Sequence, residues 1–196
     1  MSASEAIVKS FRELVAIMPY DKIAVYEICE KAGVSRKTFY VNFQSKASIV
    51  NKIVYDDIIA PLAKANEVLP LMLSSDEILE KLPRLLNENI YKSFYQDKEF
   101  YSRLCCRAGS LDSPLVDAII TGLQNLNFDI LEALGTNVEP WECDYIAYFY
   151  SSSNALLVQR WIRGGMTVPP EDMARLFDKM TTPFWRSVAA GEFSAS

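Results

Sequence analysis

The sequence predicts an all-α protein of about nine helices, and three observations support this. Apolar residues recur at helical spacings of three and four along most of the 196 residues. The alternating pattern of a half-buried strand is nearly absent. Glycine is scarce, with 7 residues, which argues against Gly-rich β architecture and phosphate-binding loops. We expect a small N-terminal three-helix, helix-turn-helix domain and a larger C-terminal helical bundle.

The first helix is expected to begin at a capping box. Ser2 is the cap, and Glu5 reaches back to the main chain. Pro19 ends this helix because proline cannot continue it. One apolar stripe then faces the core, formed by Ile7, Phe11, Leu14, Val15 and Met18.

The next two helices are short and joined by a tight turn. The first spans about residues 25–32, and Gly33 permits the turn that follows it. Ser35 caps the second by accepting from its free N–H groups. Phe39 and Phe43 are four residues apart, so both side chains face the core.

Six more helical segments complete the predicted fold. Ser45 caps a fourth helix that runs to Leu62 or beyond, with a kink expected at Pro61. A capping box at 74–77 opens a fifth helix, in which Pro83 is a second expected kink. The predicted helices of the body cover about 74–95, 98–107, 114–134 and 140–161, and a last one begins at Pro169–Pro170.

Charge and composition exclude several classes of protein. The net charge is −5, but residues 1–48 carry seven basic and five acidic side chains, whereas residues 49–196 carry thirteen and twenty. The N-terminal segment is therefore locally basic. No histidine is present, which excludes His-based catalytic triads and His-ligated metals. Only carboxylates such as Asp56 and Asp57 remain for catalysis, and adjacent helical positions point apart, so we do not expect an enzyme.

The four cysteines do not form a recognisable metal motif. Cys29, Cys105, Cys106 and Cys143 have no CxxC spacing, and reduced, packed thiols are the favoured interpretation. Oxidant or soft-metal sensing by Cys105 and Cys106 stays open. No metal and no cofactor are expected.

No segment predicts a membrane association. The N-terminus lacks an uninterrupted apolar stretch, so it is not a signal peptide. The longest uncharged run, residues 145–159, is too short and too polar to span a bilayer. We expect a cytoplasmic protein.

The third helix has the side chains that a major-groove reader needs. With Phe39 and Phe43 facing inward, its other faces carry basic, hydroxyl and aromatic groups. Arg36 or Lys37 can donate to the O6 and N7 atoms of guanine, and Val41 can touch a thymine methyl. The alternative is a helical hairpin whose charged face is merely solvated.

Flanking side chains are expected to contact phosphates. Thr38, Tyr40 and Asn42 can donate to phosphate oxygens. Lys46 lies in the first turn of the fourth helix, where its charge and the free N–H groups both favour an anion. Double-stranded DNA is therefore the predicted partner.

Residues 7–54 closely resemble the DNA-binding domain of the tetracycline-repressor (TetR) family. The matching motifs are K-I-x-V-x-x-I at 22–28, A-G-V-S at 32–35, T-F-Y at 38–40 and F-x-x-K at 43–46. The resemblance implies a three-helix DNA-binding domain, a connecting helix and an all-helical C-terminal domain that binds ligand and dimerises.

The resemblance also assigns roles by position. Arg36 and Lys37 match base-reading sites. Thr38, Tyr40 and Lys46 match phosphate-contacting sites, and Tyr26 matches a site on the second helix that reaches DNA. Two residues depart from the family pattern: Ala24 replaces a frequent threonine, and Asn42 replaces a frequent histidine. We expect a weakened anchor at these positions rather than loss of binding.

Residues 161–174, W-I-R-G-G-M-T-V-P-P-E-D-M-A, are similar to a subgroup that includes the DhaS-type regulator of dihydroxyacetone-kinase genes. The match is short. It leaves open an alternative in which the protein activates transcription or responds to a protein co-regulator.

The last two helices have wide apolar faces. Some of these residues must fill the subunit's own core, but a two-fold dimer would read two half-sites. The resemblance places a homodimer interface on these helices. Its candidate residues are Tyr145, Phe149, Leu156, Trp161, Met173, Leu176, Phe177, Met180 and Phe184.

A small-molecule pocket is predicted between the middle helices, where aromatic residues concentrate. Simple core packing is the alternative at each position. The candidate effector-pocket residues are Tyr91, Phe94, Tyr95, Phe100, Tyr101, Arg103, Leu104, Cys105, Tyr148 and Asn154.

These features predict a ligand-responsive transcriptional regulator. Residues 1–45 would form the DNA-binding domain, and residues 46–196 the connecting helix and the effector-binding and dimerisation domain. A repressor that leaves a palindromic operator when an unknown small-molecule or protein effector binds is the favoured form. A helical interaction module without DNA binding is a further alternative.

Overall fold

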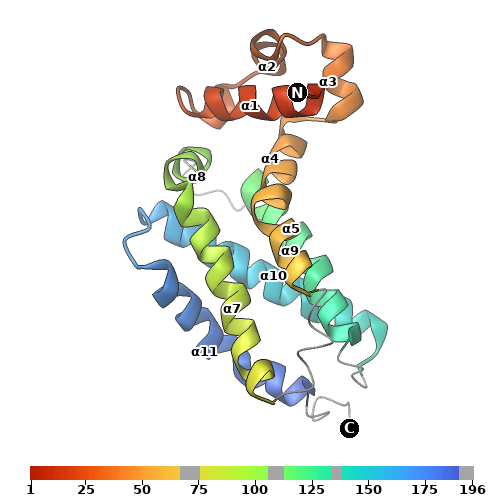
Figure 1. The fold of residues 1–196 in the computed structure, drawn as a ribbon, viewed down its shortest axis with the longest axis vertical. Coiled ribbons are helices and arrows are strands. Elements are labelled where there is room, and N and C mark those ends of the chain that lie inside the picture. The colour runs from red at the N-terminus through yellow and green to blue at the C-terminus, as the bar shows by residue number, and fades with distance from the viewer. Residues whose placement is uncertain (67–75, 106–112, 134–137, 190–196) are drawn as a thin grey trace.

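The computed structural model describes residues 1–66, 76–105, 113–133 and 138–189 (Figure 1). Every regular element in these ranges is helical. Residues 46–66 form one continuous helix, so the described ranges hold nine helices beside a short 3₁₀ turn. The all-α prediction is therefore confirmed.

Three helices form a unit at one end of the molecule (Figure 1). They are α1 (Ala3–Val15), α2 (Val25–Ala32) and α3 (Arg36–Asn42). The 3₁₀ turn η1 (Tyr20–Lys22) lies between α1 and α2. We call α1–α3 the reader domain; its helices contact one another and share one apolar core.

Local capping sets the starts of α1 and α3 and the end of α2 as the sequence predicts, whereas α1 ends at Val15, before Pro19. Glu5 N–H donates to Ser2 Oγ over 3.2 Å, and Ser2 N–H donates to the Glu5 carboxylate over 2.7 Å. Ser35 Oγ accepts from Thr38 N–H at 3.0 Å. Gly33 ends α2 with φ +65°, a left-handed conformation that favours glycine.

One long helix leads from the reader domain into the body. It consists of α4 (Lys46–Val54), the π turn η2 (Tyr55–Ile59) and α5 (Ala60–Asn66). The π turn, in which Ala60 N–H donates to Tyr55 O, lies directly before Pro61, where the sequence predicts a kink. Proline has no N–H for the carbonyl four residues before it, so a local change of register accommodates it.

The π turn also explains the spacing of the buried side chains. These residues follow at intervals of four, five and four: Ile49, Ile53, Ile58 and Leu62. An uninterrupted α-helix would instead place Asp57 on the buried stripe. The extra residue directs Ile58 inward and leaves Asp57 on the side of the helix.

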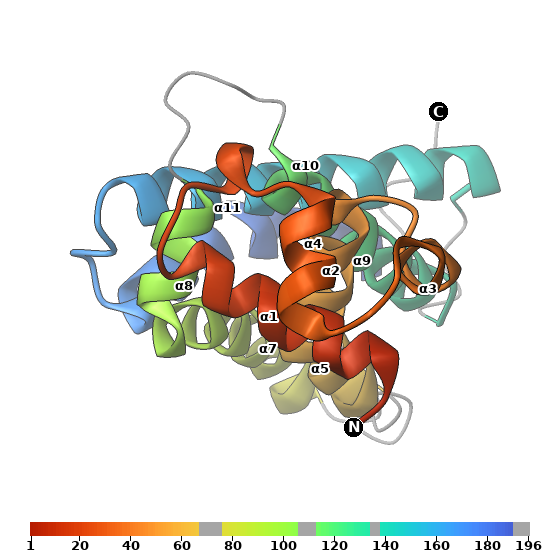
Figure 2. The ribbon, with the colours of Figure 1, turned by 90° about the horizontal axis from the view of Figure 1, so that it is seen from above.

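Five helices make up the body: α7 (Asp76–Gln96), α8 (Lys98–Leu104), α9 (Pro114–Ala133), α10 (Pro140–Arg163) and α11 (Pro170–Ala189). α9 packs against α10 and α4, and α11 packs against α7. Figure 2 shows α8 beside α1, directly under the reader domain. None of the described helices is long and apolar enough to cross a membrane.

A close approach joins α9 to the π turn. A Cβ atom built on Gly122 would lie 2.5 Å from Ile59 Cγ1, and the Ile59 side chain is buried. A Cβ atom at this position would force the buried Ile59 side chain to move. Gly122 therefore permits the close approach of α9 to the connecting helix.

Candidate nucleic-acid interface

Helix α3 separates inward and outward side chains as the sequence predicts. Phe39 is fully buried, and its ring lies 6.2 Å from that of Phe43. Arg36 and Lys37 are exposed, and Val41 is 77% exposed. The basic groups at the start of α3 are thus free to meet a duplex, while the two phenylalanines attach the helix to the domain.

Two polar residues of α3 also make bonds within the helix. Thr38 Oγ1 and Ser35 Oγ are 2.9 Å apart, and Asn42 Nδ2 donates to Thr38 O over 2.8 Å. The Asn42 amide keeps a second N–H group, and its side chain is exposed. Tyr40 is 57% exposed at the outer surface.

Lys46 is placed differently from the other candidate phosphate contacts. Its ammonium group donates to the main-chain oxygens of Tyr20 over 2.6 Å and Ile23 over 2.9 Å. The same nitrogen lies 4.2 Å from the centre of the Tyr20 ring, and burial raises the pKa of the Tyr20 hydroxyl to about 12. Lys46 thus joins α4 to the segment before α2, a structural role that the sequence does not reveal.

Helix α2 contributes one exposed candidate. Tyr26 is 53% exposed. Ala24 lacks the hydroxyl group of the threonine that is frequent in the family. The lost cap is partly replaced, because Ala24 N–H donates to the Glu27 carboxylate over 2.7 Å. This is one half of a capping box.

The predicted effector-pocket residues fall into two groups. Most of them lie inside the body, and three do not: Tyr95, Arg103 and Tyr148 are exposed, and Arg103 pairs with Glu99 at 3.0 Å. Those brought together in the core are Tyr91, Phe94, Phe100, Tyr101, Leu104, Cys105 and Asn154. Cys106 lies outside the described residues.

Polar atoms within this aromatic interior lack partners. Asn154 Nδ2 donates to Asn87 Oδ1 over 3.3 Å, but Asn154 Oδ1, Gln159 Nε2 and the Tyr91 hydroxyl meet no hydrogen-bonding group among the described residues. Burial raises the pKa of Tyr91, so its hydroxyl stays protonated and can donate. Such atoms are uncommon in a core that is only packed.

The predicted dimer residues also fall into two groups, one buried and one exposed. Trp161, Met173 and Phe177 are buried within the subunit, and Phe184 packs on the ring of Tyr150 at 5.0 Å. These four belong mainly to the subunit's own core. α11 packs along α7, and Trp161 of α10 packs against Tyr91 of α7. The remaining candidates are exposed: Tyr145, Phe149 and Leu156 on α10, and Leu176 and Met180 on α11.

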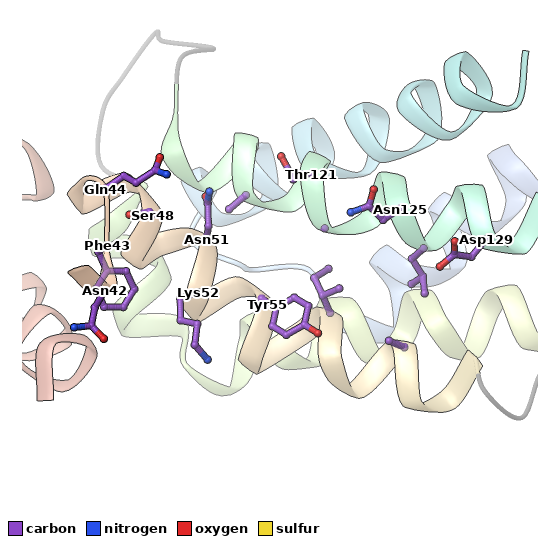
Figure 3. Close-up of a pocket in the computed structure, with 15 residues that line it drawn as sticks. Asn42, Phe43, Gln44, Ser48, Asn51, Lys52, Tyr55, Thr121, Asn125 and Asp129 are labelled. Atoms are coloured by element: carbon purple, nitrogen blue, oxygen red, sulfur yellow. The ribbon is translucent and has the colours of Figure 1, made fainter. Parts of the chain in front are cut away.

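A groove of about 700 Å³ is lined by α4 and the π turn on one side and by α9 on the other (Figure 3). It begins at the reader domain, where Asn42 and Gln44 line it, and runs along α9 to Asp129 (Figure 3). Sequence reasoning missed this site. Its walls come from segments that are some 70 residues apart, and no local spacing links them.

Two sequence profiles match the chain. The profile for bacterial regulatory proteins of the tetR family matches residues 7–53. The profile described as transcriptional regulator C-terminal region matches residues 80–183. Curated proteins give no match.

Solved structures share the fold at low sequence identity. The dihydroxyacetone kinase operon activator DhaS is 15% identical, with a TM-score of 0.57 over 95% of this chain and 97% of that one. NalD of Pseudomonas aeruginosa, the secondary repressor of the MexAB-OprM multidrug efflux pump, is 19% identical, with a TM-score of 0.57 over 95% and 96%. A putative TetR-family regulator from Syntrophomonas wolfei is 18% identical, with a TM-score of 0.57 over 99% and 98%.

The two profiles cover the reader domain and most of the body, and the C-terminal one alone spans more than half of the chain. The N-terminal profile includes α2 and α3, which have helix-turn-helix geometry. The chain belongs to the tetR family of bacterial transcriptional regulators.

Proposed function

We propose that this DNA-binding regulator is a repressor that binds a palindromic operator as a homodimer and is released by an effector. Residues 1–45 would form the DNA-binding domain, and residues 46–196 the connecting helix and the effector-binding and dimerisation domain. The effector would change the angle of the reader domain through the connecting helix. To do so, it must bind the two angular states with different affinity.

The exposure of α3 carries the proposal. Arg36 and Lys37 stand at its start with no ion pair to an acidic residue of the described chain. Both side chains are exposed, whereas Phe39 of the same helix is fully buried. A short cationic helix anchored by its apolar side is suited to entering the major groove.

Selection of bound fragments from random duplex DNA tests this function most directly. A dimer should recover a palindrome whose half-sites lie one or more helical turns apart. A recovered motif without two-fold symmetry would argue against the dimer. Failure to retain any duplex at low salt would reject DNA binding and favour a helical interaction module.

Two single substitutions separate base reading from domain stability. Arg36→Ala should cost about 1–3 kcal/mol of operator binding and relax the preference at one base pair, with little change in melting temperature. Lys46→Ala should weaken binding to all sequences and also lower the melting temperature, because it removes two bonds to main-chain carbonyls. Electrophoretic mobility shifts on matched and mismatched operators, with thermal unfolding, provide the readouts. An unchanged melting temperature for Lys46→Ala would contradict the structural role.

The proposed homodimer is supported by the exposed apolar side chains of α10 and α11. Phe149 and Tyr145 are 63% and 69% exposed. Large apolar side chains that are exposed at helical spacing on one helix often mark an interaction site. A second copy of the same face would cover them.

The proposed effector site lies between α7 and α10. Tyr91, Asn154 and Gln159 each have an unpaired buried polar atom. The Tyr91 ring lies 5.4 Å from that of Trp161, and Asn154 bonds to Asn87 of α7. An uncharged aromatic compound with a few hydrogen-bonding groups fits these surroundings. Thermal-shift screening of such compounds should find stabilisers of the wild type that fail on Asn154→Leu. Stabilisers that act equally on both proteins would place the site elsewhere.

The fold does not distinguish a repressor from an activator, so a transcription measurement is needed. The similar structures include a named activator and a named repressor. We expect a reporter gene behind the selected operator to be silenced by the protein. Increased transcription would assign activation instead, and a dependence on a second protein would identify a co-regulator as the effector.

A further inference from the structure

One partly buried cation connects the reader domain to the body. Arg12, on α1, donates from Nη1 to Asp97 Oδ2 over 2.7 Å and from Nη2 to Asp57 Oδ2. Tyr101 Oη donates to the same Asp57 oxygen over 2.8 Å. The Arg12 guanidinium lies 4.5 Å from the centre of the Phe100 ring. These five residues form what we call the Arg12 junction.

The Arg12 junction joins three separate parts of the chain. Arg12 comes from the reader domain, Asp57 from the π turn, and Asp97 and Tyr101 from the α7–α8 corner. α8 lies beside α1 in both Figure 1 and Figure 2. The relative placement of reader domain, connecting helix and body is therefore specified at one point.

The Arg12 junction is partly shielded from water and geometrically defined. The side chains of Arg12, Asp57 and Asp97 are 29%, 32% and 46% exposed, and Tyr101 is fully buried. Burial alone would lower the pKa of Arg12, but the hydrogen bond and charge of Asp57 raise it above its ordinary value. A planar guanidinium that binds two carboxylates through different nitrogens fixes direction as well as distance.

Asp97 contributes to the Arg12 junction instead of capping its own helix. Asp97 precedes α8 at the position where an aspartate usually caps a helix. Its side chain makes no capping bond, and its carboxylate binds Arg12 instead. The residue therefore serves the contact between domains rather than its own helix.

The opposite side of the connecting helix faces α9 and carries the groove between them. Residues two apart on a helix point in nearly opposite directions. Asp57 faces α1 and α8, whereas Tyr55 and Ile59 line the groove against α9 (Figure 3). The Arg12 junction thus connects the reader domain to the body on one side of this helix, and the groove lies on the other.

We propose that Arg12, Asp57, Asp97 and Tyr101 are positioning residues that fix the tilt of the reader domain and so set the operator half-site spacing that the dimer accepts. This inference rests on the proposed DNA-binding dimer. In a two-fold dimer, the tilt of each reader domain sets the separation of the two α3 helices. One added base pair moves a half-site by about 3.4 Å and also rotates it around the duplex, so a fixed tilt discriminates between spacings.

Two neighbouring aspartates provide a matched test. Asp57→Asn removes the central charge of the Arg12 junction. Asp56→Asn removes the same charge one residue earlier, at an exposed side chain whose ion pair among the described residues is with Lys52 on its own helix. The net charge and the nonspecific attraction to DNA change equally in both. Full-length wild type and variants would be titrated with the selected operator and with versions whose spacer is one base pair shorter, one longer and two longer.

Wild type and Asp56→Asn should prefer the selected spacing by the same factor. In Asp57→Asn we expect that factor to fall by about fivefold or more, the scale of a typical coupling between sites. Tyr101→Phe, which deletes only a hydroxyl group, should give an intermediate loss. It keeps the test decisive should Asp57→Asn fail to fold.

Spacing preference is a readout that stability alone does not move. If Asp57→Asn and Tyr101→Phe lower the melting temperature but keep the wild-type spacing preference, the positioning role is overturned. If the wild type binds the operator with no spacing preference, the inference also fails while the DNA-binding function stands. If the wild type binds no duplex, the proposed function itself fails.

Discussion

Replacing Phe39 by alanine is expected to lower the free energy of unfolding by about 3–5 kcal/mol, the usual cost of deleting a fully buried aromatic side chain. Phe39 is 0% exposed and packs beside Phe43 in the core shared by α1–α3. Because α3 has only seven residues, it depends on this tertiary packing rather than on its own helix stability. Operator binding should be lost together with the fold of the reader domain.

Tyr40→Ala is the matched control for Phe39→Ala. Tyr40 is the next residue on the same helix and another aromatic, but it is 57% exposed. We expect it to leave the urea midpoint nearly unchanged and to weaken DNA binding through a lost phosphate contact. Equal destabilisation by the two substitutions would show that α3 is not attached through its phenylalanine.

Replacing Phe149 by glutamate is expected to convert the dimer to a monomer and to lower operator affinity by about 10²–10⁴-fold, the gain that linking two binding events usually provides. Phe149 is 63% exposed on α10. A charge at the centre of an apolar contact would have to be desolvated without a partner. Sedimentation and operator titration measure the two effects.

Ile17→Glu controls for the removal of an exposed apolar side chain. Ile17 is 71% exposed, directly after α1 and away from α10 and α11. It should not alter the sedimentation coefficient. A Phe149→Glu protein that remains dimeric, or a wild type that is monomeric at micromolar concentration, would move the interface elsewhere or remove it.

Helix boundaries were predictable where short-range chemistry sets them. Ser2, Ser35 and Ser45 each accept from an N–H group three residues ahead, and Gly33 adopts the left-handed conformation that its turn requires. Such signals lie within a few residues of sequence. They were sufficient to place the reader domain and the outward residues of α3.

Contacts between distant segments were not predictable in the same way. Periodicity identified the apolar faces of α10 and α11, but it could not tell that Trp161 lies under α7 while Phe149 points outward. Lys46 looked like a phosphate contact, and its carbonyl partners lie more than twenty residues away. Arg12 and Asp97 are 85 residues apart, so nothing in the local pattern joined them.

The π turn has a geometric consequence for the whole regulator. Removing one residue between Tyr55 and Ile59 would restore an unbroken α-helical register and swing everything upstream about the helix axis by about 100°. Arg12 would then face away from Asp97, and α3 would be rotated relative to the body. The orientation of the reader domain therefore depends on the number of residues in this one helical turn.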